Sequence, residues 1–198
     1  MGKLERFYQS AFEPDQRALS EAYSLLNSGK FETAIKELER LATKGSHVAP
    51  AYLGSAYENG PSGMKDNERA LSWYAQSAER GNPTGQFLLG SLYRKVGRAT
   101  LAREPLEKAA AQGFTPASYR LYLMYERGDG VDQDHTAARK YLHQAVNEGH
   151  VYAIRALALQ MLRGKYGILG VLKAPFLIGR GFRVTMSALR ERGSLKLY

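Results

Sequence analysis

The sequence predicts an all-α protein in which pairs of antiparallel helices stack into a solenoid, and three observations indicate this fold. A glycine suited to end a helix recurs at steps of 36, 32 and 36 residues, at Gly45, Gly81, Gly113 and Gly149. A tyrosine in the first helix of a pair recurs at steps of 36 and 32 residues, at Tyr57, Tyr93 and Tyr125. An alanine in the second helix recurs at Ala34, Ala70, Ala102 and Ala138. Self-similarity at this period is typical of helical repeat proteins.

The stretch 51–82 shows the repeating unit, which is two helices joined by a turn. Small and apolar residues stand at helical spacing in the first helix, as far as Tyr57. The turn at 59–63 ends this helix, because its glycine and proline residues do not continue one. The second helix is expected to begin near Asp66 or Asn67, either of which can cap it. One such hairpin cannot bury its own apolar face, so it requires neighbouring hairpins.

The other hairpins are placed by the same pattern. The first spans about 15–45, and the third, at 83–114, is shorter, with a second helix expected to begin close to Pro105. The fourth has the most aromatic first helix, and a further first helix is expected at 151–163. The predicted organisation is a lead-in at 1–14, a helical repeat solenoid at 15–163 and a basic C-terminal segment at 164–198.

Two hairpins carry closely matching motifs. In the second hairpin the matching residues are Leu53, Gly54, Tyr57, Gly60, Gly63, Met64, Asp66, Ala70, Trp73, Tyr74, Ala78 and Gly81. In the fourth they are Tyr125, Gly128, Asp129, Gly130, Val131, Asp134, Ala137, Lys140, Tyr141, Ala145, Gly149 and His150. These motifs resemble the Sel-1-like repeat, a relative of the tetratricopeptide repeat, while the first hairpin looks more like a plain tetratricopeptide hairpin. The resemblance covers roughly 15–163 and implies a right-handed α-solenoid in which the recurring aromatic residues pack between helices.

The resemblance also implies a function, that of a non-enzymatic scaffold or adaptor holding a partner protein in the concave groove of the solenoid. Proteins similar to this one serve bacterial membrane-associated assemblies, so exopolysaccharide or cell-envelope biosynthesis is the expected setting and an inner-membrane protein a candidate partner. By analogy with the tetratricopeptide repeat, first helices line the groove. The expected groove residues are Tyr23, Glu58, Phe87, Arg94, Tyr119, Glu126 and Arg155. Their mixed chemistry suits a peptide or helix of a partner; the alternative is that several of them only pack against neighbouring helices.

Composition bounds the compartment and the class of partner. The chain has no cysteine, which excludes disulfides and cysteine-bound zinc. It has no apolar signal region and no run of 18 uncharged apolar residues, so a cytoplasmic protein is expected, with peripheral attachment at the inner membrane as an option. The net charge is +9, of which residues 163–198 carry +7. Because the excess charge lies in the tail, where apolar residues dominate, nucleic acid is not the expected partner.

The basic tail allows two interpretations. Pro175 is expected to divide it, and beyond the proline residues 178, 182, 186 and 189 share one helical face. The tail can cap the last apolar face of the solenoid. Alternatively it contacts a partner or an anionic membrane surface, where each basic residue contributes about 1 kcal/mol. The expected contact residues are Lys173, Arg180, Phe182, Arg183, Arg190 and Arg192. The second interpretation carries the alternative function, a peripheral membrane-binding protein.

No pattern in the chain points to catalysis, to a cofactor or to a metal. The sequence has no GxSxG motif, no P-loop and no dinucleotide fingerprint. Asp129, Asp132 and Asp134 lack the later glycine and glutamate of a calcium loop. The four histidines lack the spacing of a zinc site. We therefore expect no enzyme activity, no cofactor, no metal and no small-molecule substrate.

Overall fold

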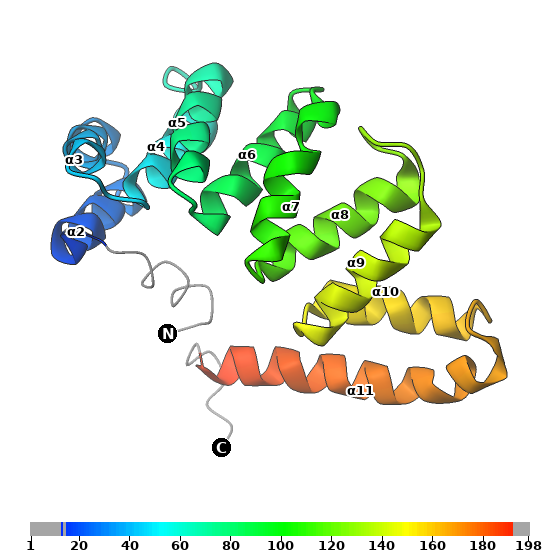
Figure 1. The fold of residues 1–198 in the computed structure, drawn as a ribbon. Coiled ribbons are helices and arrows are strands. Elements are labelled where there is room, and N and C mark those ends of the chain that lie inside the picture. The colour runs from blue at the N-terminus through cyan, green and yellow to red at the C-terminus, as the bar shows by residue number, and fades with distance from the viewer. Residues whose placement is uncertain (1–12, 14, 192–198) are drawn as a thin grey trace. The chain divides into compact units, whose positions relative to one another are not determined.

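A computed structural model describes residue 13 and residues 15–191, and within these residues the chain is helical and contains no strand (Figure 1). The elements are α2 (Gln16–Asn27), α3 (Phe31–Thr43), α4 (Ala49–Asn59), α5 (Asn67–Glu79), α6 (Pro83–Lys95), η1 (Ala99–Leu101), α7 (Arg103–Ala111), α8 (Thr115–Arg127), α9 (His135–Asn147), α10 (Val151–Leu162) and α11 (Gly167–Glu191). The prediction of an all-α helical repeat fold is confirmed.

The chain forms two compact units, which are described separately. The N-terminal unit comprises the described residues up to Gln112, and the C-terminal unit begins at Gly113. The boundary falls within the range 15–163, which the sequence predicted as one array. The C-terminal unit also includes α11, which lies in the segment predicted as a separate tail.

The N-terminal unit consists of three consecutive hairpins. Helix α2 pairs with α3, α4 with α5, and α6 with η1 and α7, while α3 packs on α4 and α5 on α6. Two apolar clusters join its hairpins, one around Leu38 and Leu53 and the other around Tyr74 and Leu92. Because each cluster draws residues from consecutive hairpins, the apolar face of one hairpin is covered by the next.

The repeat motifs explain where the helices begin. Asp66, rather than Asn67, caps α5, since its Oδ1 accepts a hydrogen bond of 3.0 Å from the backbone N–H of Arg69. Asp134 caps α9 in the same way and accepts from the N–H groups of Thr136 and Ala137. The N–H of each aspartate also bonds the carbonyl of the tyrosine nine residues earlier, Tyr57 or Tyr125. The two hairpins therefore share one turn geometry, and their residues can be compared position by position.

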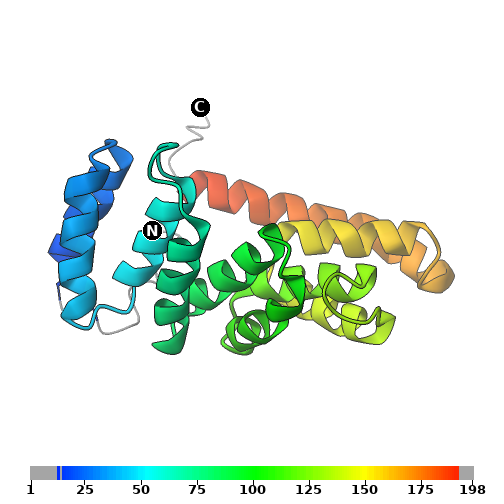
Figure 2. The ribbon, with the colours of Figure 1, turned by 90° about the horizontal axis from the view of Figure 1, so that it is seen from above.

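Within the C-terminal unit, α8 pairs with α9, and α10 pairs with α11. Helices α10 and α11 run side by side in both views (Figures 1 and 2). Gly170, Ala174 and Gly181 on α11 are buried and Leu177 is half-buried. These residues recur at steps of four, three and four, so they form one helical face. A Cβ added to Gly181 would lie 3.2 Å from Cγ2 of Ile154 on α10, which shows how closely the two helices approach.

The expectation that Pro175 divides the tail is wrong. Helix α11 is continuous across Pro175, which lies inside it. A proline in this position has no N–H to donate to the carbonyl of Val171, a loss normally costly inside a helix. Pro175 is exposed and opposite the face that packs on α10, where water can satisfy that carbonyl. The small buried residues on both sides of the proline hold α11 against α10, and this packing outweighs the lost bond.

Among the described side chains of α11, most of the large apolar ones are exposed, whereas Leu177 packs against the core. The exposed apolar residues on α11 are Ile168, Leu169, Val171, Leu172, Phe176, Ile178 and Phe182. Four of them are more than 65% exposed, with Ile168 at 79% and Phe176 at 72%. A helix whose small residues are buried and whose large apolar residues face outward is the reverse of an ordinary surface helix.

Candidate functional site

The predicted groove residues of the N-terminal unit have different environments. Tyr23 on α2 is 47% exposed and stacks on Tyr52 of α4, with ring centroids 5.1 Å apart. Phe87 and Arg94 on α6 are half-buried, and both take part in contacts within the protein. Tyr23 is therefore the predicted groove residue of this unit with the most open side chain.

Glu58 is engaged in the packing of its own unit. Its carboxylate accepts a hydrogen bond of 2.9 Å from the hydroxyl of Tyr74 on α5 and one of 2.8 Å from Nζ of Lys95, the last residue of α6. The side chain is 15% exposed. Glu58 thus connects three helices and two consecutive repeats, and a partner could reach it only by displacing these contacts.

Glu126 in the C-terminal unit occupies the equivalent position and makes an equivalent ion pair. Its carboxylate lies 3.1 Å from Nδ1 of His135 on α9 and 3.6 Å from Nζ of Lys165, which follows α10. In both units a glutamate at the end of a first helix therefore contacts a lysine at the end of the next first helix. The sequence placed Glu58 and Glu126 in the groove; the structure gives both a role between repeats.

An aromatic patch, made of the half-buried Tyr119 and His150 and the exposed Tyr152, lies on the C-terminal unit. The Tyr119 ring, on α8, stacks on His150 with centroids 4.5 Å apart, and Tyr152, on α10, lies 6.4 Å from Tyr119 and 5.9 Å from His150. Tyr152 is 64% exposed. Arg155, one turn later on α10, is also exposed. Tyr119 and Arg155 were predicted from the sequence. Tyr152 was not, because no aromatic residue recurs at its position in the other repeats.

His150 is held in place within the patch by a hydrogen bond to the start of α10. Its Nδ1 accepts a hydrogen bond of 3.3 Å from the backbone N–H of Ala153 and so caps α10. Burial lowers the pKa of His150 from its usual value, because the charged imidazolium loses hydration. The neutral imidazole required by the cap is therefore the favoured form at neutral pH.

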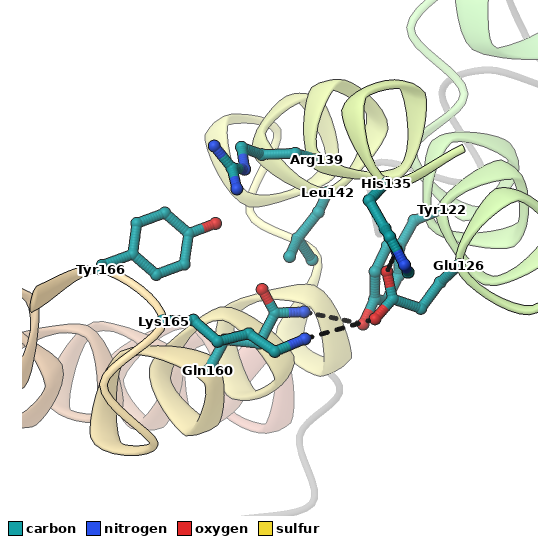
Figure 3. Close-up of a pocket in the computed structure, with 8 residues that line it drawn as sticks. All are labelled: Tyr122, Glu126, His135, Arg139, Leu142, Gln160, Lys165 and Tyr166. Carbon is teal, nitrogen blue, oxygen red and sulfur yellow. Dashed lines mark hydrogen bonds and ion pairs between the residues drawn. The ribbon is translucent and has the colours of Figure 1, made fainter. Parts of the chain in front are cut away.

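A pocket of about 270 Å³ opens in the C-terminal unit between the α8–α9 hairpin and the α10–α11 hairpin (Figure 3). Its lining residues are Tyr122, Glu126, His135, Arg139, Leu142, Gln160, Lys165 and Tyr166. Glu126 and His135 lie at one end and Tyr166 at the other (Figure 3). The hydroxyl of Tyr122 accepts a hydrogen bond of 3.1 Å from Nε2 of Gln160, and its pKa is raised, mainly by burial.

An exchange of residues between the two matching repeats explains this pocket. In the second hairpin Gly54 leaves room for Tyr74, whose hydroxyl reaches Glu58. In the fourth hairpin the equivalent residues are Tyr122 and Leu142. Leu142 has no hydroxyl to donate and is shorter than tyrosine, so space remains beside Glu126. This departure from the repeat pattern is the sequence signal that could have located the pocket.

The predicted contact residues of the tail are only partly described. Lys173, Phe182 and Arg183 on α11 are exposed. The backbone of Arg180 and Arg190 belongs to α11, but their side chains lie outside the described part of the structure, as does Arg192 entirely. Among the described residues, no helix is both long and apolar enough to span a bilayer. Within the same residues, no group of three or more potential metal ligands comes together.

Comparison with known proteins identifies repeats of a known type in this chain. The Sel1 repeat family model matches residues 49–82 and 115–150. Over 172 residues the chain is 27% identical to chitin synthase regulatory factor 3 of Schizosaccharomyces pombe, covering 83% of this chain and 17% of that protein. It is 22% identical to the ERAD-associated E3 ubiquitin-protein ligase component HRD3 of Candida glabrata, covering 80% of this chain and 21% of that protein. The chain therefore spans about a fifth of the length of these relatives.

Two solved structures share the fold. A Sel1 repeat protein from Oxalobacter formigenes aligns with a TM-score of 0.72 at 23% identity, covering 84% of this chain and 69% of that one. A protective antigen of uropathogenic Escherichia coli with an SLR fold aligns with a TM-score of 0.73 at 24% identity, covering 97% of this chain and 51% of that one. The repeat matches and the shared fold agree with the motifs of the second and fourth hairpins, so the predicted resemblance to the Sel-1-like repeat family is confirmed.

Proposed function

We propose that this protein is a non-enzymatic adaptor that binds another protein, and that the aromatic patch is a main contact surface. The names of its relatives, a regulatory factor and a component of a ubiquitin ligase, support a role in protein interaction. The observation that carries the proposal is the exposure of Tyr152 beside Tyr119 and Arg155. Tyrosine and arginine are enriched at the residues that dominate binding energy in protein interfaces.

The geometry of the patch favours binding without large rearrangement. Tyr119 is held by stacking on His150, and His150 is held by its hydrogen bond to the N-terminus of α10. A side chain that is already ordered loses little conformational entropy when a partner covers it. Tyr152 adds an exposed ring with a polar hydroxyl, a combination suited to a partly wet interface.

Site-specific photo-crosslinking in the native cell tests this proposal. A photoreactive phenylalanine analogue at Tyr152 is expected to give a crosslinked product of discrete mass. The same analogue at Leu101, which is 53% exposed on η1, is the matched control and is expected to give none. Y119A and R155E should weaken the Tyr152 product at least fivefold, whereas R163E should not. Equal products from both positions, or a product indifferent to Y119A and R155E, would refute the patch as the contact surface.

We propose as a second function that α11 attaches the protein to an anionic membrane surface, as in a bacterial exopolysaccharide or cell-envelope assembly at the inner membrane. The exposed apolar face of α11 supports this proposal, since Phe176 and Phe182 are 72% and 65% exposed and Lys173 and Arg183 are exposed on the same helix. Burying an exposed phenylalanine yields about 1.5–3 kcal/mol. Basic residues near an anionic leaflet add about 1 kcal/mol each.

Flotation of the full chain with lipid vesicles tests membrane attachment. Vesicles containing phosphatidylglycerol should carry the protein upward, and pure phosphatidylcholine vesicles should carry much less. F176S with F182S should abolish flotation, and Y152S, which changes an equally exposed aromatic residue on α10, should not. Point variants are preferable to a truncation, because removing α11 also uncovers α10. Absence of flotation, or flotation unaffected by the two serine substitutions, would exclude this attachment.

A further inference from the structure

We propose that the pocket in the C-terminal unit is a binding site for a singly charged carboxylate group, held by Arg139 and Tyr166. This inference goes beyond the adaptor proposal and does not depend on it, because none of these residues belongs to the aromatic patch. The pocket volume of about 270 Å³ accommodates an acid of the size of an acidic side chain.

Tyr166 supplies the first unpaired group. Its hydroxyl is out of contact with water and has no hydrogen-bond partner among the described residues, although most buried hydroxyl groups have one. Figure 3 shows this hydroxyl directed into the pocket, toward Arg139, Leu142 and Gln160. Burial raises the pKa of Tyr166, so the hydroxyl keeps its proton and can donate a hydrogen bond. An acceptor brought by a ligand would satisfy it.

Arg139 supplies the second group. Its guanidinium carbon lies 5.6 Å from the centre of the Tyr166 ring, and the side chain is exposed. It makes no ion pair with the described residues. The planar guanidinium is suited to bind a carboxylate through two parallel hydrogen bonds. Together, Arg139 and Tyr166 therefore present a cation and a neutral donor to the same space.

The other charges in the pocket select against a doubly charged ligand. Glu126 is at the opposite end, where Lys165 and His135 lie within 3.6 Å and 3.1 Å of its carboxylate. Its negative charge is thus largely balanced by groups that are already paired. A single additional negative charge matches the remaining guanidinium, whereas a phosphate with two charges would exceed it. Glu126 would then also repel the excess charge.

Titration of the 15N-labelled full chain tests the site by following the amide resonances of residues around the pocket. The probes are propionate, the blocked peptide acetyl-Ala-Glu-Ala-amide, its glutamine counterpart and inorganic phosphate. We expect pocket shifts with propionate and the glutamate peptide, and shifts at least fivefold weaker with the glutamine peptide and phosphate. A glutamate peptide that binds at least fivefold better than propionate would identify a partner's side chain as the source, and equal binding would identify a free acid.

Matched variants then assign the contacts. R139Q and Y166F should each weaken propionate binding at least fivefold while leaving the spectrum of the fold intact. K140Q, next to Arg139 in sequence, and Y152F, on α10, change a basic residue and a tyrosine outside the pocket and should bind as the unaltered protein does. The proposal is overturned if no carboxylate shifts the pocket resonances at millimolar concentration, if phosphate or the glutamine peptide binds as well, or if R139Q and Y166F bind normally.

Discussion

The substitution G54A should destabilise the N-terminal unit, although alanine is a better helix former than glycine. Gly54 lies in the middle of α4, where the exchange alone would add about 1 kcal/mol of helix stability. However, a Cβ at residue 54 would lie 2.5 Å from Cε1 and 3.0 Å from Cγ of Tyr74. Carbon atoms in favourable contact are about 3.5–4.0 Å apart. The ring of Tyr74 must therefore move by about 1 Å to accept the methyl group.

Tyr74 cannot move without further cost. Its side chain is fully buried, and its hydroxyl donates to Glu58 at 2.9 Å. Overpacking of a filled core costs about 1–3 kcal/mol, and loss of the hydrogen bond adds about 1 kcal/mol. After subtraction of the helix-forming gain, we expect G54A to lower the free energy of unfolding by about 1–3 kcal/mol.

Urea denaturation followed by the fluorescence of Trp73, the single tryptophan, measures this loss in the N-terminal unit. With an m value of about 1–2 kcal/mol per M, the midpoint should fall by about 1 M. G63A is the control, since a Cβ at Gly63 meets no atom within 4 Å, and it should leave the midpoint nearly unchanged. In the Y74L background the cost of G54A should largely vanish. An unchanged or higher midpoint for G54A would show that helix propensity, not the contact with Tyr74, governs this position.

Three further predictions concern other parts of the fold. E13A should lower the free energy of unfolding by about 1–2 kcal/mol, because the Glu13 carboxylate accepts hydrogen bonds of 2.6–2.9 Å from the Ser46 hydroxyl and from two N–H groups at the start of α4. Urea denaturation followed by Trp73 fluorescence measures this loss, with E79A as the control. The C-terminal unit should lose stability as the pH falls below about 6.5, since the pKa of His150 is lowered in the folded state and the unfolded chain takes up the proton first. Thermal unfolding at pH 7 and pH 5 measures this loss, and H150N should make it smaller. A 1–163 fragment should melt at a lower temperature than the full chain and aggregate, whereas I168S, on the exposed face of α11, should melt as the full chain does.

The repeat phase allowed the helices to be predicted closely, because each boundary depends on local chemistry. Asp66 and Asp134 cap helices through bonds to N–H groups two or three residues later, so the cap can be read from a short stretch of sequence. The continuity of α11 could not be read in this way. Pro175 favours a break locally, and the helix persists only because residues before and after it pack on α10. Such packing is a property of the tertiary structure.

The groove residues were harder to predict than the helices, because position on a first helix does not decide whether a charge is free. Glu58 and Arg94 occupy equivalent positions in consecutive repeats. Glu58 is committed to Tyr74 and to Lys95 of the next repeat, a contact between residues far apart in sequence. A periodic acidic residue is therefore as consistent with the joining of repeats as with ligand binding. The two roles can be distinguished only by where the counter-ion of the acidic residue lies. The counter-ion of Glu126, Lys165, is also far from it in sequence.

The pocket shows where function can arise in a repetitive fold. Gly54 with Tyr74, and Tyr122 with Leu142, are two solutions to the same packing position, since each pair places one phenol ring between the two helices of a hairpin. In the first solution the phenol hydroxyl bonds the repeat's glutamate. In the second it bonds Gln160 on the next first helix, so the space beside Glu126 remains open. Keeping the repeat residues preserves the fold, whereas exchanging residues across one helix pair opens a pocket without disturbing it. A departure from periodicity thus marks the pocket in this chain, and the periodic residues do not.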